Sequence, residues 1–202
     1  MIELLVATTN CGKLAEVGSY LEHLPLRILT LQHLGEFPKV IEDGCTFEAN
    51  ALKKATTLAS FSGLLTLADD SGLEVEALNG APGIYSARYC GEAGNDQKNN
   101  EKLLAELKGL PQERRAARFV CALALCAPKS LEVPLWTVRE SCQGTIAFSP
   151  SGQNGFGYDP LFFYPPLGRT FGEIDRATKA TVSHRGKALK KLARIFPSIA
   201  DL

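Results

Sequence analysis

The chain has 202 residues, of which 45% are hydrophobic and 22% are charged. This length and balance exclude a disordered or fibrous chain and predict a single globular domain over residues 1–202. The 22 lysines and arginines equal the 22 aspartates and glutamates in number. Because a neutral chain has no general attraction for nucleic acid or for an anionic membrane, we expect neither as a partner.

Targeting and redox signals are weak. The N-terminal sequence has a short apolar run without a preceding basic region, and no apolar run approaches the length needed to cross a bilayer. The six cysteines form neither a C-x-x-C pair nor a zinc-ligand spacing. We therefore expect a cytoplasmic protein with reduced, partly buried thiols.

The first half of the chain alternates strand and helix patterns. Apolar runs rich in β-branched residues predict strands, and apolar residues spaced three and four apart predict helices. Thr46 is placed to accept the N-cap hydrogen bond of the second helix. The predicted segments are strands at 3–9, 26–31 and 63–69, helices at 12–24 and 47–61, and a loop at 33–44.

The second half begins with a helix that we expect to run from Asp96 as N-cap to Gly109 as its stop. Two long segments at 115–127 and 133–148 then predict an antiparallel ribbon around a turn region at residues 127–131. A shorter strand is predicted at 160–164, and a last helix at 183–196 with Ser183 as its cap.

This alternation predicts an α/β fold with a mixed central sheet flanked by helices. Ligands of such sheets bind beyond the carboxyl ends of the strands. The segments "TTNCGK" at 8–13 and "DDSG" at 69–72 follow predicted strands. We expect both to be loops of a binding site.

The segment that begins at Thr8 joins a strand to a helix through small polar residues and one cation. The hydroxyls of Thr8 and Thr9, the Asn10 amide and the Lys13 ammonium could hold a phosphate beside the amide groups of the helix start. It is not the Gly-rich P-loop pattern. A capped helix start with a solvated lysine explains the same residues.

Asp69 and Asp70 are carboxylates of the kind that Mg²⁺ prefers, because this ion takes one or two protein carboxylates and leaves its other positions to water and phosphates. Successive side chains of a strand point in opposite directions. One acid could therefore face a ligand while the other braces a loop. The alternative is an exposed acidic turn that also contains Ser71 and Gly72.

Two later segments could bind a nucleotide. Glycines at 152, 155 and 157 surround Phe156, so that backbone could approach a flat ligand on which the ring stacks. His184 and Arg185 lie in the first turn of the last predicted helix, where the helix dipole disfavours cations. Uncompensated charge there would indicate an anionic or acceptor-rich ligand. An ordinary turn and a solvated amphipathic helix are the alternatives.

Five segments together carry a resemblance: T-x-N-x-x-K near the start, "TFEANALKKA", "ADDSGLEVEALNGAPGIYSARY", "GFGYDPLF" and "SHRGKAL". In this order, over nearly the whole chain, they resemble the inosine triphosphate pyrophosphatase family. The resemblance implies a mixed α/β fold with a long central sheet, two lobes with a cleft between them, and a homodimer.

The resemblance also implies roles for individual residues. Thr8, Asn10 and Lys13 would contact the triphosphate, and Lys54 would be a further phosphate contact. Asp70 would be the general base and a Mg²⁺ ligand, with Glu42 as the other ligand. The remaining nucleotide-binding residues would be Ser71, Phe156, Gly157, Tyr158, Asp159, Lys179, His184 and Arg185.

The activity implied is the hydrolysis of non-canonical purine nucleoside triphosphates, dITP, ITP, XTP and dXTP, to the monophosphate and pyrophosphate. The donors of His184 and Arg185 would match the 6-oxo group of these bases and not the 6-amino group of adenine. Two alternatives stay open at this point. One is a Maf-like pyrophosphatase that acts on pyrimidine or modified nucleotides, and the other is a nucleotide-binding regulator without turnover.

Overall fold

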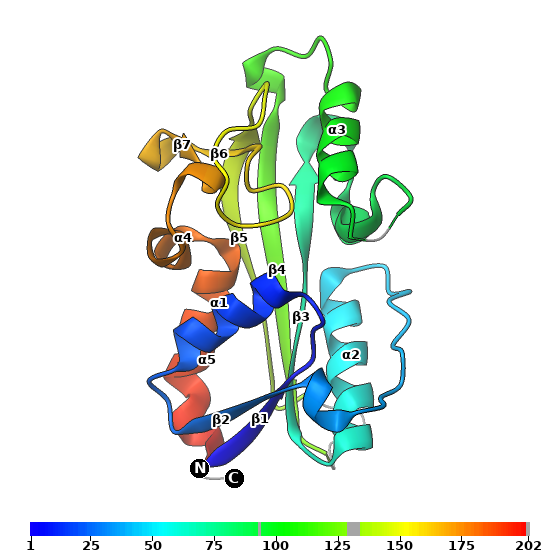
Figure 1. The fold of residues 1–202 in the computed structure, drawn as a ribbon, viewed down its shortest axis with the longest axis vertical. Helices are drawn as coiled ribbons and strands as arrows, with labels where there is room; N and C mark the ends of the chain where they lie inside the picture. The colour runs from blue at the N-terminus through cyan, green and yellow to red at the C-terminus, as the bar shows by residue number, and fades with distance from the viewer. Residues whose placement is uncertain (93, 129–133, 201–202) are drawn as a thin grey trace. The chain divides into compact units, whose positions relative to one another are not determined.

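The structure, a computed structural model, describes residues 1–92, 94–128 and 134–200 (Figure 1). Within these residues seven strands form one sheet in the order β2-β1-β3-β4-β5-β6-β7. The strands are β1 (Ile2–Val6), β2 (Leu26–Thr30), β3 (Leu65–Val75), β4 (Ala116–Cys126), β5 (Trp136–Ile146), β6 (Phe162–Tyr164) and β7 (Arg169–Thr170). The helices are α1 (Cys11–Leu21), α2 (Phe47–Ser62), α3 (Asp96–Glu106), α4 (Arg176–Val182) and α5 (His184–Ala200). Short 3₁₀ helices lie at Leu31–Leu34, Glu76–Leu78, Gly83–Arg88, Gln112–Arg114, Pro165–Leu167 and Phe171–Glu173.

The sheet is mixed, as predicted. Strand β1 pairs in parallel with β2 and with β3, whereas β6 pairs antiparallel with β5 and β7. Between β4 and β5, the Leu135 amide donates to the Leu125 carbonyl and the Ile146 amide donates to the Arg115 carbonyl. The partner number falls as the donor number rises, so this ribbon is antiparallel. The turn region predicted at 127–131 lies partly outside the described residues.

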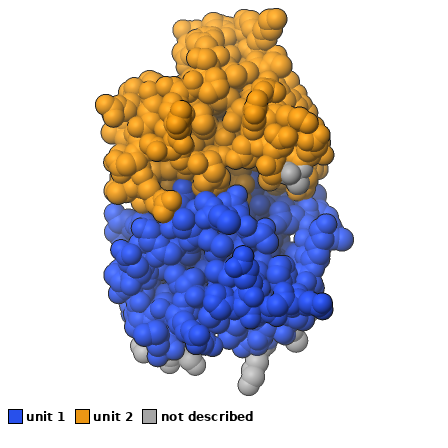
Figure 2. Space-filling model, in the orientation of Figure 1, with its two compact units in different colours: residues 1–70, 121–140, 185–202 blue, residues 71–120, 141–184 orange. Residues whose placement is uncertain are grey.

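The chain forms two compact units, coloured separately in Figure 2. Unit 1 contains Met1–Asp70, Cys121–Glu140 and Arg185–Leu202, and unit 2 contains Ser71–Val120 and Ser141–His184. Strands β3, β4 and β5 therefore contribute residues to both units. The single domain over 1–202 and the cleft between two lobes stay predictions.

Unit 1 is layered, with α1 and α5 on one face of its strands and α2 on the other (Figure 1). The sequence of β4 explains why helices cover both faces. Residues on both faces of this strand are apolar and buried, which is typical of a central strand. On α2 the residues Ala51, Ala55 and Leu58 are buried. The core against α1 and α5 consists of Leu4, Val6, Val17, Leu21, Leu67, Cys121, Leu123, Leu125, Ala188, Leu189, Leu192 and Phe196.

The ends of α2 follow from two residues. The Thr46 hydroxyl accepts a hydrogen bond of 3.1 Å from the Ala49 amide, which confirms the predicted N-cap. At the other end Gly63 adopts φ +69° and its amide donates to the Ala59 carbonyl. A left-handed residue of this kind ends a helix and is easiest for glycine.

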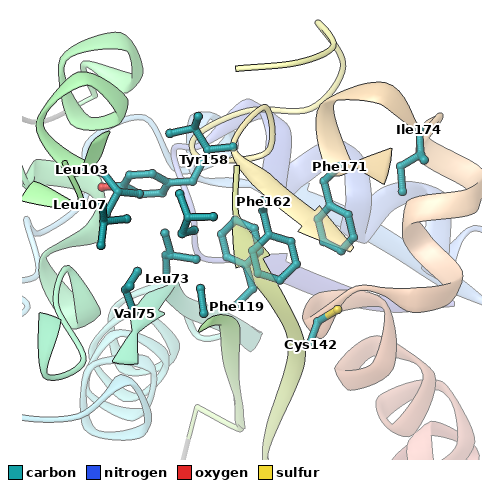
Figure 3. Close-up of a cluster of buried hydrophobic side chains, with 13 residues drawn as sticks. Leu73, Val75, Leu103, Leu107, Phe119, Cys142, Tyr158, Phe162, Phe171 and Ile174 are labelled. Atoms are coloured by element: carbon teal, nitrogen blue, oxygen red, sulfur yellow. The ribbon is translucent and has the colours of Figure 1, made fainter. Parts of the chain in front are cut away.

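Unit 2 has its own aromatic core (Figure 3). The Phe119 ring lies 4.6 Å from the Phe162 ring and 6.0 Å from the Phe171 ring, measured between centroids. Leu103 and Leu107 from the α3 region pack against the same cluster. The packing fixes the ends of β3, β4 and β5 that belong to this unit.

The prediction that the third strand ends at Asp69 and that "DDSG" is a loop is wrong, because β3 continues to Val75. Gly72 helps the strand to continue: a Cβ atom there would lie 2.3 Å from the Ser86 hydroxyl oxygen and 2.6 Å from the Gly83 carbonyl oxygen. The Leu73 amide donates to that hydroxyl over 2.9 Å. Close packing of the 3₁₀ helix Gly83–Arg88 therefore needs a glycine inside the strand.

The helix predicted from Asp96 is capped by the residue before it, so the predicted cap is wrong. The Asn95 side chain accepts from the Lys98 amide over 3.1 Å, and the helix ends at Glu106, before Gly109 with φ +81°. Strand β7 and helix α4 were not predicted. Ser183 is the C-cap of α4, and its role as a cap of α5 stays a prediction.

All six cysteines lie within the described residues and are free thiols, with Cys121, Cys126 and Cys142 buried, as predicted. In the described part of the chain, each helix is either too short or too polar to span a bilayer.

Candidate active site

The turn between β1 and α1 has the strand, turn and helix order that the sequence predicted. The Asn10 side-chain oxygen caps α1 by accepting from the Lys13 amide over 3.0 Å, and the Thr8 hydroxyl accepts from the Asn10 amide over 3.1 Å. Thr9 and Asn10 are exposed. The turn therefore presents hydroxyl and amide groups at the positive end of a helix dipole.

Asp69 is buried in an ionic cluster on the α1 and α5 side of the sheet. Its Oδ1 atom lies 2.5 Å from the Lys13 Nζ atom, and its Oδ2 atom accepts from the Arg185 Nε atom over 2.7 Å. The Cys121 thiol donates to the same Oδ2 atom over 3.3 Å. Glu16 pairs with the Nη1 atom of Arg185. Asp69 thus joins α1, β3, β4 and α5.

The charges of this cluster are mutually stabilising. Burial raises the pKa of Asp69, but the cations Arg185 and Lys13 outweigh burial and hold this pKa well below its usual value. Burial lowers the pKa of Arg185, and the carboxylates of Asp69 and Glu16 raise it well above its usual value. Asp69 and Arg185 therefore stabilise each other in their charged forms.

Asp70 faces the opposite side of the sheet, toward α2. Burial raises the pKa of Asp70, the positive charges of Lys13 and Lys54 lower it, the negative charge of Glu42 raises it, and the nearby Asn50 side chain lowers it. The net shift is upward. A carboxylate whose pKa is moved toward neutrality is a better general base than an ordinary aspartate.

The segment before α2 places Glu42 beside Asp70. The Glu42 carboxylate lies 2.5 Å from the Lys54 Nζ atom, and the same ammonium donates to the Asp69 carbonyl over 3.1 Å. The Asn50 side-chain oxygen accepts from the Gly44 amide over 2.8 Å. A Cβ atom at Gly44 would lie 2.7 Å from that oxygen, so this close approach requires glycine.

The donor set of Glu42 and Asp70 fits a hard divalent cation. Two carboxylates on one side of the sheet are what Mg²⁺ takes from a protein when phosphates and water fill its other positions. Among the described residues, no three histidine, cysteine, aspartate or glutamate side chains group into a metal site.

In unit 2 the predicted base-side residues form a second group. The Asp159 Oδ2 atom lies 2.5 Å from the Lys179 Nζ atom and accepts from the Phe156 amide over 2.9 Å. The Lys179 ammonium lies over the Phe156 ring at 4.8 Å from its centroid. A Cβ atom at Gly155 would lie 2.0 Å from the Asp159 Oδ2 atom, so a side chain there would displace the carboxylate from Lys179.

The backbone of Gly157 is held by two residues of α3 that are four positions apart. The Gly157 amide donates to the Asp96 Oδ2 atom over 2.7 Å, and the Gly157 carbonyl accepts from the Asn100 side-chain Nδ2 atom over 2.9 Å. The neighbouring Tyr158 hydroxyl donates to the Ser86 carbonyl over 2.8 Å. Several contacts therefore fix the loop that carries Phe156.

His184 is buried, and its ring stacks on Phe119 with 4.7 Å between centroids and 14° between planes. Arg185 follows it in the chain and is also buried. The expectation of uncompensated positive charge at this helix start is wrong, because Asp69 and Glu16 compensate Arg185. Ser71 lies inside β3, directly after Asp70.

Each unit thus brings several predicted residues together. In unit 1, Lys13 contacts Asp69, whose second oxygen binds Arg185, and Glu42 and Lys54 lie beside Asp70. In unit 2, Asp159 joins Lys179 to the Phe156 amide. The roles of these residues toward a ligand stay predictions.

Sequence reasoning missed four residues that hold these groups. Glu16 lies three positions after Lys13 on α1, a spacing that places both on one helix face. Asn50 is a poor helix former among alanines and leucines, which was a usable signal. Asp96 was interpreted only as a cap, and nothing local marks Asn100.

Comparison with known proteins gives one consistent result. The model of the Ham1 family matches residues 4–195. A dITP/XTP pyrophosphatase of Syntrophobacter fumaroxidans is 55% identical over 97% of this chain and 82% of that protein. One of Geobacter sulfurreducens is 51% identical over 95% of each. The solved structure of a HAM1 protein from Coxiella burnetii has a TM-score of 0.88 at 39% identity, covering 98% of this chain and 100% of that chain. This chain therefore belongs to the Ham1 family.

Proposed function

We propose that this protein hydrolyses the non-canonical purine nucleoside triphosphates dITP, ITP, XTP and dXTP to the monophosphate and pyrophosphate, with Mg²⁺ as its cofactor. The names of its relatives, dITP/XTP pyrophosphatases at up to 55% identity, support the substrate class. Membership of the Ham1 family disfavours the Maf-like alternative. Such an enzyme would remove unwanted nucleotides from the cytoplasmic pool.

The observation that carries the proposal is the contrast between Asp69 and Asp70. Asp69 is engaged by Lys13 and Arg185, and its pKa is lowered. Asp70 has a raised pKa and lies among Glu42, Lys54 and Asn50. Asp70 accepts a proton from a water molecule whose oxygen attacks the α-phosphorus. The bond from that phosphorus to the bridging oxygen breaks, and pyrophosphate leaves.

Glu42 and Asp70 would hold Mg²⁺. When bound, this ion would supply positive charge to the phosphate oxygens. The chain supplies further positive charge through Lys54, whose ammonium is already held beside both carboxylates.

The β1–α1 turn would bind the triphosphate. Thr8, Thr9 and Asn10 offer hydroxyl and amide groups at the start of α1, and Lys13 offers an ammonium group. Phosphoryl transfer depends mainly on positioning and on neutralising charge. A turn with donors and a nearby cation is therefore sufficient, and a covalent nucleophile is not required.

The group in unit 2 would bind the nucleoside. Ser71, Lys179 and the segment 156–159 would contact it, and a donor from His184 would match the 6-oxo acceptor of hypoxanthine or xanthine. Adenine presents a 6-amino donor at this position, so the hydrogen bond would be lost. Sites built around one buried hydrogen bond can discriminate by about 10⁴-fold. The Arg185 atoms Nε and Nη1 are directed to carboxylates, which leaves His184 as the better candidate for this contact.

A product assay tests the function. Purified protein with Mg²⁺ is given dITP, XTP, GTP, ATP and dTTP, and chromatography separates monophosphate plus pyrophosphate from diphosphate plus phosphate. We expect the first pair of products, with dITP and XTP well ahead of the rest. Preference for dTTP would support a Maf-like activity instead, and tight dITP binding without products would support a regulator.

His184→Ala tests the base contact within the same panel. The proposal requires the variant to lose discrimination between dITP and ATP, whereas unchanged discrimination would refute the contact. The proposed homodimer is a separate matter, which light scattering after size-exclusion chromatography measures directly.

A further inference from the structure

The loop that carries Phe156 has a sequence that does not fix its own conformation. Glycines precede and follow this residue, and both have left-handed backbone angles, with φ +77° at Gly155 and φ +62° at Gly157. Glycine reaches such angles readily, but it also gives an unsupported loop many other conformations. Residues 151–160 belong to no helix or strand. The direction of the Phe156 ring therefore depends on contacts that the loop makes with other side chains.

Side chains hold three consecutive peptide groups around Phe156. The Phe156 amide donates to the Asp159 carboxylate over 2.9 Å. The Gly157 amide donates to the Asp96 Oδ2 atom over 2.7 Å, and the Gly157 carbonyl accepts from the Asn100 Nδ2 atom over 2.9 Å. Because each peptide group is planar, holding three in succession fixes the backbone angles of the two residues between them, Phe156 and Gly157.

Helix α3 supplies two of these three contacts and is itself firmly anchored. Asp96 and Asn100 are four residues apart and therefore lie on one face of the helix. Leu103 and Leu107 continue this face, and both are fully buried in the aromatic core of unit 2 (Figure 3). The apolar part of the face fixes α3 to the core, so the polar part holds the loop at a defined place.

Asn100 is better explained by its contact with the loop than by the stability of α3. Its Oδ1 atom is buried and has no hydrogen-bond partner among the described residues, whereas its Nδ2 atom binds the Gly157 carbonyl. A buried acceptor without a partner is unfavourable. Leucine at this position would remove that acceptor and is a better helix former than asparagine. What leucine would not supply is the donor to Gly157.

We propose that Asp96 and Asn100 are positioning residues, which hold the backbone of Gly157 so that the Phe156 ring is directed to stack on the base of the nucleotide. The inference rests on the proposed function, because it takes Phe156 as a nucleotide-binding residue. Stacking uses the face of a base, which every nucleobase has. The two residues therefore set the affinity for the nucleoside part of the substrate, and groups at the base edge set the choice among bases.

Kinetics and calorimetry on Asn100→Leu test the proposal. We expect KM for dITP to rise by about tenfold while kcat changes by less than about twofold, because losing this hydrogen bond loosens the loop and leaves the reacting phosphate alone. KM for XTP should rise by the same factor. The dissociation constant of inorganic tripolyphosphate, measured with Mg²⁺ present, should stay at the wild-type value, because this ligand has no base. The midpoint of urea unfolding should not fall.

A second contact and a matched control accompany this variant. Asp96 is exposed, so Asp96→Ala should fold, and it should raise KM for dITP as Asn100→Leu does. Asp96→Asn keeps an acceptor for the Gly157 amide and should restore most of the affinity. Gln97 is an exposed amide of the same helix that donates to Glu101 and not to the loop. Gln97→Ala should therefore keep the wild-type KM.

A double-mutant cycle shows whether the effect passes through the Phe156 ring. In a Phe156→Ala background, Asn100→Leu should raise KM no further, because the ring that it positions is gone. An equal rise in both backgrounds would overturn the proposal. So would a loss of tripolyphosphate affinity or of unfolding stability that accompanies the rise in KM, since a merely structural role of α3 predicts both.

The outcomes separate this inference from the proposed function. A wild type that hydrolyses dITP, together with unchanged KM in Asn100→Leu and Asp96→Ala, overturns the positioning role alone. A wild type that forms no monophosphate from dITP removes the proposed function and the inference with it.

Discussion

Two neighbouring ion pairs of unit 1 join the segment before α2 to α2 itself. They differ in how exposed they are and in whether they lie beside Asp70. Lys53 pairs with Asp43 at 2.6 Å, and Lys54 pairs with Glu42 at 2.5 Å. The side chains of the first pair are 43% and 64% exposed, and those of the second pair are 12% and 30% exposed. Glu42 and Lys54 also act on the pKa of the buried Asp70.

The comparison teaches that contact distance does not mark a functional pair. An exposed pair is screened by water and contributes little to stability. A partly buried pair beside a third charge acts at lower effective dielectric, where it can shift a pKa or hold a cation. Sequence adjacency and chemistry are matched in these two pairs, so each serves as the control for the other.

The largest expected difference in rate concerns Asp70, the carboxylate beside the partly buried pair of Lys54 and Glu42. Asp70→Asn should lower kcat for dITP by about 10³-fold, because it removes the proposed base and a metal ligand. Asp43→Asn removes the carboxylate of the exposed pair with Lys53, and this variant should retain the wild-type rate. Steady-state kinetics on both variants decide it, and a near-normal rate for Asp70→Asn would refute the proposed role.

The two lysines provide the next comparison. Lys54→Met should reduce kcat for dITP by about 10²-fold, since a preorganised cation near the leaving phosphate stabilises charge that develops in the transition state. Lys53→Met should change kcat by less than about twofold, because its ammonium is exposed. Equal losses in the two variants would mean that helix stability, and not charge near the phosphate, explains the effect.

The two acids of the pairs sharpen the assignment of the metal. Glu42→Gln should raise the Mg²⁺ concentration for half-maximal activity by about tenfold or more, because a neutral amide is a weaker ligand than a carboxylate. The matched change, Asp43→Asn, should leave the Mg²⁺ titration as it is. A Glu42→Gln titration that overlays the wild-type curve would exclude Glu42 as a ligand.

The smallest expected effect is on stability. Burial raises the pKa of Asp70 in the folded state, so ionised Asp70 destabilises the fold above that pKa. This destabilisation disappears as the pH falls below the pKa that Asp70 has in the unfolded chain. In metal-free urea unfolding, Asp70→Asn should therefore be more stable than the wild type at neutral pH, and the difference should shrink toward acid pH.

Asp43 supplies the contrast for this measurement. A hydrogen bond from Lys53 lowers the pKa of Asp43, but this carboxylate is exposed. Asp43→Asn should thus have the same unfolding midpoint as the wild type at neutral pH. A destabilised Asp70→Asn would contradict the assignment of burial as the dominant cause of the Asp70 shift.

Features decided by neighbouring residues were predictable from sequence. The Thr46 cap and the strand, turn and helix at the N-terminus depend on residues a few positions apart, and the antiparallel ribbon joins two segments that follow each other in the chain. The structure contains all three. The family resemblance covered nearly the whole chain, and the match to the Ham1 family confirmed it. The mixed sheet followed from the order of elements alone.

Features decided by distant partners were not predictable. The apolar run stops at Ala68, which suggested the end of a strand, yet β3 continues because Asp69 finds cations 56 and 116 positions away. Arg185 looked uncompensated for the same reason, since no local pattern announces its pairing with Glu16. Helix α4 and the two-residue strand β7 are too short to leave a clear periodic signal.

Because successive side chains of β3 point to opposite faces of the sheet, Asp69 and Asp70 have different surroundings although they are chemically identical. The register between β1 and β3 decides which aspartate points to which face. Val6 pairs with Leu67, two residues before the first acid. One residue inserted between Leu67 and Ala68 would turn the former Asp69 toward α2 and present an alanine methyl group to Lys13 and Arg185. The position that faces α2 would still hold an aspartate, so the loss would fall on the ionic cluster of Lys13 and Arg185.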